Sequence, residues 1–211
     1  ENSNQYYFDG EWVDFEKFNV DIPIKLVGKK GIVHTESAFW SIHGPVIKGK
    51  KATYAVRYSW EDAIKAVEQW YKMNKSENFE EWNDAMSMMA IPMFNAIYAD
   101  KEGNIFYIYN AKLPIRNSQY NWEGVILGDN SESLWKEFIS YEDLPKVLNP
   151  SSGFIMNCNN TPTYTSSEDN PTIMISDDYY SGIETKITNR SLRAMSLFED
   201  NPSISYEDFK Q

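Results

Sequence analysis

The feature that most constrains the fold is a change of hydrophobic period, which occurs twice along the chain. Residues 6–58 carry short apolar runs separated by turn signals such as Asp9-Gly10, a pattern typical of strands joined by hairpins. Residues 59–91 instead repeat apolar side chains at helical spacing. Residues 93–116 return to alternation around Gly103. The sequence therefore predicts strands, then helices, then a further hairpin.

The helical region divides into two predicted helices. Ser59 is a suitable N-cap for the first, and Asn78 for the second, with Glu81 three residues further on. Pro92 ends the region because proline cannot continue a helix. The predicted buried face of the first helix consists of apolar residues at helical spacing, namely Trp60, Ala63, Ile64, Val67, Trp70 and Tyr71.

A short stretch at residues 149–162 combines three signals. Turn formers fill residues 149–153, and the apolar residues 154–156 predict a short buried strand. Three carboxamides follow at the end of this strand, from Asn157, Asn159 and Asn160. A carboxamide –NH2 is an uncharged double donor, so when it is held rigidly it can stabilise negative charge on a carbonyl oxygen during acyl transfer. The alternative is a plain turn, because asparagine is a routine turn residue.

This stretch resembles the penicillin acylase (penicillin amidase) family of N-terminal-nucleophile hydrolases, in which a strand reading N-P-x-S-G-y-i-x-N-x-N-N-x-P carries the oxyanion asparagine. Matched position by position, that asparagine is Asn159. Further segments resemble the family in the same order along the chain, at residues 43–47, 98–107, 113–116, 122–124 and 143–145. The resemblance extends from about residue 6 to residue 199.

The resemblance implies an α+β fold, in which the chain supplies part of the family's four-layer αββα sandwich, mainly antiparallel sheet with covering helices. It implies a single domain over residues 1–211, as a fragment of a larger acylase β-chain without the nucleophile segment and the C-terminal part. The segment at residues 43–46 and the long insert after Asn159 resemble acyl-homoserine lactone and aculeacin-type acylases.

The resemblance also implies the reaction, which is hydrolysis of an amide between an acyl chain and an amine. A β-lactam side chain, an N-acyl-homoserine lactone and a lipopeptide acyl group are the implied substrates, and the sequence does not choose among them. In the family the nucleophile is a serine that self-cleavage of a zymogen leaves at a chain start, and its α-amino group acts as the base. Glu1 has no nucleophilic group, so the fragment alone is expected to be inactive.

Arg190 is the second candidate site residue. A third helix is predicted to begin at Thr188 or Asn189, which places Arg190 in the first turn. A cation at this end opposes the helix dipole, which hints at another role. The resemblance implies that an arginine here contacts the oxyanion asparagine or the substrate. Arg190 is therefore predicted to organise the site.

Other reactive residues have simpler interpretations. Cys158 has asparagine neighbours and no adjacent base, so it is interpreted as a small buried hydrophobe. His34 and His43 are interpreted as strand histidines, and Asp100 as a turn-capping residue. The histidines and the cysteine do not have the spacing of a metal site, so no cofactor is predicted. Relatives of the family bind Ca²⁺, so the resemblance leaves a Ca²⁺ ion in the full-length protein as an alternative, although the carboxylates near residue 177 lack the spacing of a known calcium loop.

The charge of the chain restricts its partners. A formal net charge of −11 over 211 residues disfavours nucleic acid and anionic membranes, which require a basic face. No apolar run approaches the length of a membrane span. The resemblance implies an acylated small-molecule substrate, an α-chain and the rest of the β-chain as partners, and a periplasmic or secreted location. Unpaired sheet edges predict self-association.

Two hypotheses of different class follow. The first is an amidohydrolase fragment that contributes Asn159 and the walls of an acyl pocket. The second is a non-catalytic module that binds a ligand or a protein through an aromatic-rich sheet, since aromatic residues make up 15% of the chain. A nucleophile serine encoded upstream of this segment would favour the first.

Overall fold

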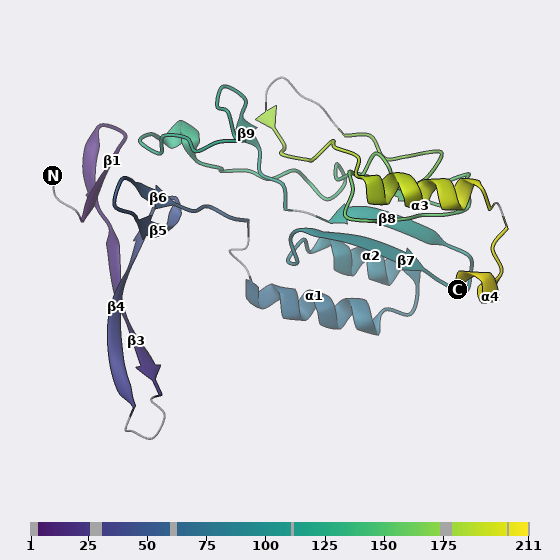
Figure 1. Ribbon diagram of the computed structural model, residues 1–211, viewed down its shortest axis with the longest axis horizontal. Coiled ribbons are helices and arrows are strands. Elements are labelled where there is room, and N and C mark those ends of the chain that lie inside the picture. The colour runs from purple at the N-terminus through teal and green to yellow at the C-terminus, as the bar shows by residue number, and fades with distance from the viewer. Residues whose placement is uncertain are drawn as a thin grey trace. The chain divides into compact units, whose positions relative to one another are not determined.

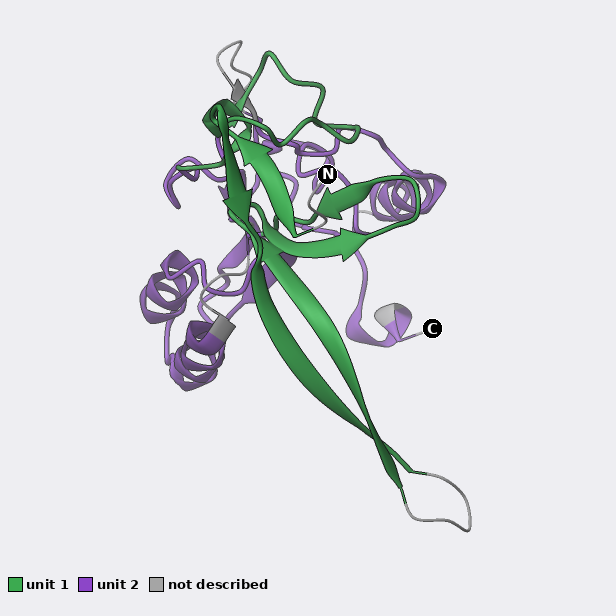
Figure 2. Cartoon of the chain, turned by 90° about the vertical axis from the view of Figure 1, so that its left-hand side faces the viewer, with its two compact units in different colours: residues 1–58, 116–136 green, residues 59–115, 137–211 purple. Residues whose placement is uncertain are grey.

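The computed structural model describes residues 4–25, 31–59, 63–110, 112–173, 179–201 and 203–210. The chain forms two compact units, coloured green and purple in Figure 2. Unit 1 consists of residues 1–58 and 116–136, and unit 2 of residues 59–115 and 137–211. Each unit therefore combines two segments that are separated in sequence, and each is described by itself.

Unit 1 begins with the predicted hairpin of β1 (Gln5–Phe8) and β2 (Glu11–Asp14). Asp9 and Gly10 form its turn with φ of 47° and 89°. Positive φ at both central residues matches the twist of the flanking strands, which explains the preference for Asp-Gly at this position. The Asp9-Gly10 prediction is confirmed.

The larger sheet of unit 1 is antiparallel, in the order β3-β4-β5-β6. Its strands are β3 (Glu16–Ile24), β4 (Ile32–Ser41), β5 (Gly44–Lys48) and β6 (Thr53–Ala55), as labelled in Figure 1. Gly44 begins β5 with a φ of 117°, and a Cβ there would lie 2.4 Å from the carbonyl oxygen of Val56. A side chain at this position is therefore excluded both by strain and by space.

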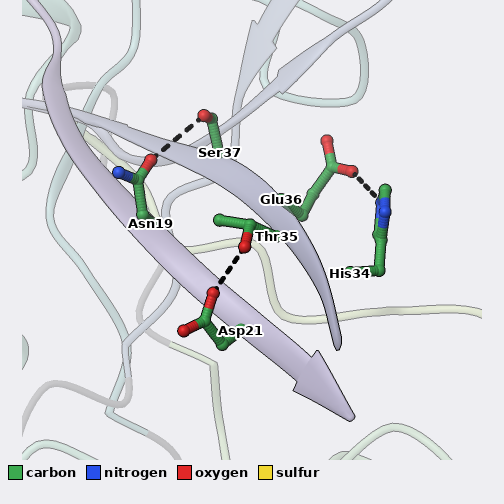
Figure 3. A network of polar contacts seen from close by, with 6 residues as sticks. All are labelled: Asn19, Asp21, His34, Thr35, Glu36 and Ser37. Carbon is green, nitrogen blue, oxygen red and sulfur yellow. Dashed lines mark hydrogen bonds and ion pairs between the residues drawn. The ribbon is translucent and has the colours of Figure 1, made fainter. Parts of the chain in front are cut away.

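Strand β3 alternates polar and apolar side chains, whereas β4 places the polar residues Glu36 and His34 opposite two of the apolar positions of β3. Figure 3 shows Ser37 donating to Asn19 and Thr35 donating to Asp21 across the strands, at 3.2 and 2.6 Å. The alternate positions of β3 are apolar and remain 39–47% exposed, at Phe18, Val20, Ile22 and Ile24. Strand alternation thus separates polar from apolar side chains on β3, and within the described residues its apolar side chains are only partly covered.

Unit 2 contains the helical pair α1 (Ala63–Lys75) and α2 (Phe79–Ser87). The predicted cap of α2 is confirmed, because the side chain of Asn78 accepts from the backbone N–H of Glu81 at 2.9 Å. Trp82 and Met86 of this helix are buried, as its spacing predicts. The predicted N-cap of α1 at Ser59 depends on residues 60–62, which lie outside the described residues.

The predicted buried face of α1 is wrong. Ile64, Val67 and Tyr71 are 82%, 69% and 64% exposed, whereas Ala66 and Gln69 are buried. Gln69 determines this orientation, because its Oε1 accepts from the backbone N–H groups of the Ala90-Ile91 turn at 2.8 and 3.0 Å. Buried N–H groups need a partner, and rotating the helix would remove it.

The core of unit 2 lies between these helices and a three-stranded antiparallel sheet of order β10-β8-β7. Its strands are β7 (Phe94–Ala99), β8 (Ile105–Asn110) and β10 (Lys146–Leu148). The buried core residues are Trp82, Met86, Phe106, Ile108, Leu113, Ile139, Tyr141 and Leu144. The central strand β8 is buried on both faces, as its continuous apolar sequence predicts.

The remaining elements are short. They are β9 (Arg116–Asn117), the 3₁₀ turn η1 (Ser131–Ser133), β11 (Tyr179–Tyr180), α3 (Asn189–Glu199) and α4 (Tyr206–Phe209). The predicted α+β class, with antiparallel sheets and few helices, is confirmed. No described helix combines the length and apolar character that a bilayer crossing requires.

Candidate functional site

The stretch at residues 149–162 forms a loop, and the strand predicted at residues 154–156 is absent from it. Met156 donates its backbone N–H to Thr165 at 2.8 Å, so its partner is another loop. Phe154 stacks on Phe198 of α3, with ring centroids 4.7 Å apart. Residues 154–156 are thus held by side-chain packing and an isolated backbone hydrogen bond, and they do not form a β-ladder.

Asn159 lies at the tip of this loop. Its backbone has a φ of 57°, the left-handed conformation that asparagine adopts more readily than most residues. Its side chain is exposed. Within the described part of the chain, Oδ1 of Asn159 accepts a hydrogen bond and no hydrogen bond engages Nδ2. The amide therefore presents its two N–H donors outward.

Arg190 contacts Asn159, although the two lie 31 positions apart. The guanidinium Nη2 of Arg190 donates to Oδ1 of Asn159 at 3.1 Å and also to the carbonyl oxygen of Cys158. Helix α3 presents Arg190 from its first turn, which is fixed by a capping box between Thr188 and Ser191. The predicted helix start and the predicted neighbourhood of Arg190 and Asn159 are both observed.

Two further asparagines hold the backbone around Asn159. Oδ1 of Asn157 accepts the backbone N–H of Asn159 at 3.1 Å. Oδ1 of Asn160 accepts the backbone N–H of Cys158 at 2.7 Å. The contact of Asn157 has a signal in the sequence, because asparagine side chains often accept the backbone N–H two residues further on. The contact of Asn160 runs backward along the chain to Cys158 and has no such signal.

The other candidate residues have structural contacts. Asp100 accepts from the backbone N–H and the side-chain amide of Asn104, which lowers the pKa of its carboxyl, and the predicted turn-capping role is observed. The predicted strand position of His43 is wrong, because His43 lies buried in the turn between β4 and β5, where its Nε2 bonds the carbonyl oxygen of Gly128 at 2.9 Å. His34 pairs with Glu36 on the exposed β4 (Figure 3). Cys158 is a half-buried free thiol.

Metal-ligating side chains are scattered over the described part of the chain. Among the described residues, no group of three or more His, Cys, Asp or Glu side chains is placed to hold a metal ion. Asp177 and Asp178 lie outside the described residues.

Each unit has a cavity of its own. In unit 2 a cavity of about 490 Å³ is lined by residues 152–154 of the same loop and by Phe198, Glu199 and Asn201 at the end of α3. Asn159 and Arg190 are not among its lining residues. In unit 1 a cavity of about 530 Å³ is lined by aromatic residues that include Tyr6, Trp12 and Phe15.

Comparison with known proteins gives consistent matches. A sequence model of the penicillin amidase family matches residues 1–211. Penicillin G acylase from Escherichia coli is 29% identical over 166 residues, which cover 77% of this chain and 19% of that protein. Acyl-homoserine lactone acylase PvdQ from Pseudomonas fluorescens is 24% identical over 118 residues, which cover 52% of this chain and 15% of that protein.

A solved structure matches over nearly the whole chain. It is a thermostable penicillin G acylase from Alcaligenes faecalis, with a TM-score of 0.76 and 28% sequence identity. The match covers 98% of this chain and 35% of that chain. In sequence, this chain spans less than a fifth of the length of penicillin G acylase from Escherichia coli and of PvdQ from Pseudomonas fluorescens.

Proposed function

The chain belongs to the penicillin amidase family, and from this premise we propose that it forms part of an amide hydrolase in which Asn159 donates a hydrogen bond to the oxyanion. The observation that carries the proposal is the environment of the Asn159 amide. Its oxygen is engaged by Arg190, and its exposed nitrogen is left to donate. An amide fixed in this way can bind developing negative charge without reorganising during the reaction.

The proposed reaction begins with attack of a serine Oγ on the carbonyl carbon of an acyl amide. The α-amino group of that serine takes the hydroxyl proton; an α-amine has a pKa of about 7.7–8.0, so a useful fraction is neutral near pH 7. The carbonyl oxygen becomes an oxyanion, to which Nδ2 of Asn159 donates. The C–N bond then breaks, the amine leaves with the proton, and water hydrolyses the resulting ester.

We place this serine outside residues 1–211. The proposal is supported by the small share of its relatives that the chain covers, 19% for penicillin G acylase from Escherichia coli. The other donor of the oxyanion hole and the α-chain are proposed to lie in that uncovered part as well. Release of the serine by self-cleavage of a zymogen and a periplasmic or secreted location belong to the same proposal.

Arg190 is proposed to organise the site through Asn159. Its contact with Oδ1 selects the amide orientation in which nitrogen faces outward, because a guanidinium can only donate. A cation on the amide oxygen also polarises the group, which strengthens the N–H as a donor. Arg190 therefore acts on the substrate through Asn159.

The proposed substrate class is an acyl chain joined to an amine through an amide bond. Its support is that the named relatives are a penicillin G acylase and an acyl-homoserine lactone acylase, at 29% and 24% identity. Penicillin G and an acyl-homoserine lactone differ in both the acyl chain and the amine, but in each of them an amide bond joins the two. Asn159 would contact only this shared group, so its role does not depend on the acyl chain.

The test is Asn159→Ala in the full-length enzyme. Loss of one oxyanion donor is expected to lower kcat by about 100- to 1,000-fold, with KM nearly unchanged, because the donor acts on the transition state. Release of the chromophore from phenylacetyl and fatty-acyl anilides measures this. Asn74→Ala is the control, since the side chain of the exposed Asn74 donates to the carbonyl oxygen of Trp70 within α1. Wild-type kcat in Asn159→Ala would contradict the proposal.

A further inference from the structure

The loop that carries Asn159 is held by other carboxamides at successive backbone groups. The N–H of Cys158 is accepted by Asn160, and the N–H of Asn159 by Asn157. The carbonyl oxygen of Cys158 is engaged by Arg190. Three consecutive polar groups of the backbone, on both sides of the Cys158 Cα, thus have partners that oppose rotation of the peptide between Cys158 and Asn159.

Asn160 is the fixed end of this arrangement. It is 4% exposed, and its Nδ2 donates to the carbonyl oxygens of Thr161 and Tyr164 at 2.9 and 2.6 Å. Both donors and the acceptor of its amide are therefore engaged, and the side chain cannot turn without losing buried hydrogen bonds. The N–H of Cys158 is therefore bonded by a side chain that two further hydrogen bonds fix in place.

The side chain of Asn157 makes fewer hydrogen bonds than that of Asn160. Its Oδ1 accepts the N–H of Asn159, while its Nδ2 is buried and has no hydrogen-bond partner among the described residues. Replacing Asn157 by alanine would therefore remove one hydrogen bond, and that bond ends on the residue that carries the proposed donor. This makes Asn157 a clean probe of the loop.

The conformation of Asn159 explains why the loop needs such contacts. A φ of 57° lies in the left-handed region, which residues other than glycine adopt only when the surroundings stabilise it. A return of the backbone to a negative φ would swing the side chain, and with it Nδ2, away from its present direction. A displacement of about 1 Å at a reacting group can lower a rate by about 100-fold.

From these contacts we propose that Asn157 and Asn160 are positioning residues, which hold Asn159 in its left-handed conformation and thereby aim Nδ2 at the oxyanion. The inference rests on the function proposed above and adds two residues to that site. Neither side chain is proposed to contact the substrate, because both act on the backbone of Cys158 and Asn159.

The experiment is a double-mutant cycle in the full-length enzyme. Asn157→Ala is expected to lower kcat by roughly 10- to 100-fold, with KM within about 2-fold of wild type, because the transition-state donor is misplaced. Asn157→Ser should give an intermediate kcat, since a serine hydroxyl accepts from the N–H two residues later, more weakly than asparagine. In the Asn159→Ala background, Asn157→Ala should lower kcat by no more than about 2-fold, because residues that act as a unit are not additive.

Asn121→Ala is the matched control. Oδ1 of Asn121 accepts the backbone N–H of Glu123 at 3.1 Å, which is the same kind of bond at the same length, in unit 1. It should retain wild-type kcat. Asn160→Ala should repeat the kinetic loss and also lower the thermal unfolding midpoint, because it leaves buried carbonyl groups without donors.

The outcomes separate this inference from the function on which it rests. A large loss in Asn159→Ala together with wild-type kcat in Asn157→Ala would overturn the positioning role and leave the proposed function intact. Losses that multiply in the double mutant would overturn it as well, since Asn157 would then act independently of Asn159. Wild-type kcat in Asn159→Ala would overturn both.

Discussion

At the scale of single residues, two opposing energies act on Arg190, namely the cost of its charge at the helix start and the gain from its hydrogen bonds. A cation in the first turn of a helix opposes the dipole at a cost of about 0.3–1 kcal/mol. Hydrogen bonds from a charged group contribute about 1.5–3 kcal/mol, toward the lower end at an exposed site such as this one. The contacts with Cys158 and Asn159 therefore outweigh the dipole term and explain why an arginine is tolerated at this position.

A prediction at this scale concerns the contact itself. Arg190→Ala in the full-length enzyme is expected to lower kcat by roughly 10-fold or more, because Oδ1 of Asn159 loses a charge-assisted donor. Arg190→Lys should fall between wild type and alanine, since it keeps the charge but loses the planar guanidinium. Arg193→Ala serves as the control; the exposed Arg193 lies on the same helix and donates to the hydroxyl of Ser196. Equal activity of Arg190→Ala and Arg193→Ala would contradict the prediction.

At the scale of elements, the β7–β8 hairpin is closed by one carboxylate. Asp100 accepts from the side-chain amide and backbone N–H of Asn104 at 2.8 and 2.9 Å, and from the hydroxyl of Tyr98 at 3.1 Å. The contact with the Asn104 side chain is the largest cause of its lowered pKa. The turn is thus stabilised by the charged form of Asp100, and the hairpin in turn supplies the central strand of the unit 2 sheet.

The resulting pH dependence has a definite sign. Because the pKa of Asp100 is lower in the folded chain than its ordinary value of 3.8, its contribution is present above that value and is lost as pH falls through the folded-state pKa. Asp100→Asn is therefore expected to be less stable than the parent above about pH 5 and nearer to it at about pH 3. Urea denaturation of residues 1–211 at several pH values measures this difference. A constant difference across that range would refute the assignment.

At the scale of the whole chain, the exposed apolar surface is extensive for a molecule of net charge −11. The outward face of α1 carries Ile64, Val67 and Tyr71 at helical spacing, and β3 carries a row of half-exposed apolar side chains. Apolar side chains at i, i+3 and i+7 form the stripe through which helices pack on one another. Such surfaces favour association with other polypeptide, including a second copy.

The prediction at this scale is concentration-dependent self-association of residues 1–211. Val67→Glu should weaken the association, because it places a charge in the centre of the α1 stripe. Lys65→Gln is the matched control, since Lys65 is also an exposed residue of α1 and its replacement changes the net charge by the same amount. Sedimentation velocity over a range of concentrations measures both variants. Association of Val67→Glu at the parental level would instead favour the sheet edges, and a monomer at every concentration would contradict both routes.

The sequence by itself determined the features that depend on neighbouring residues. The Asp9-Gly10 turn, the caps at Asn78 and Thr188, and the hairpin around Gly103 follow from local dihedral preferences and from side chains that reach their own backbone. The stretch around Asn159 was also recognisable, since its carboxamides and turn formers lie close together in sequence. These signals require no knowledge of distant segments.

Only the tertiary structure decided which surfaces are buried and which residues meet. The apolar period of α1 predicted a buried stripe, but Gln69 turns the helix the other way because two buried N–H groups need its oxygen. The apolar residues 154–156 formed no strand, because the segment beside Met156 is a loop. The contact between Arg190 and Asn159 depends on how α3 lies against that loop. Burial and long-range contacts depend on what other elements supply, which no local pattern encodes.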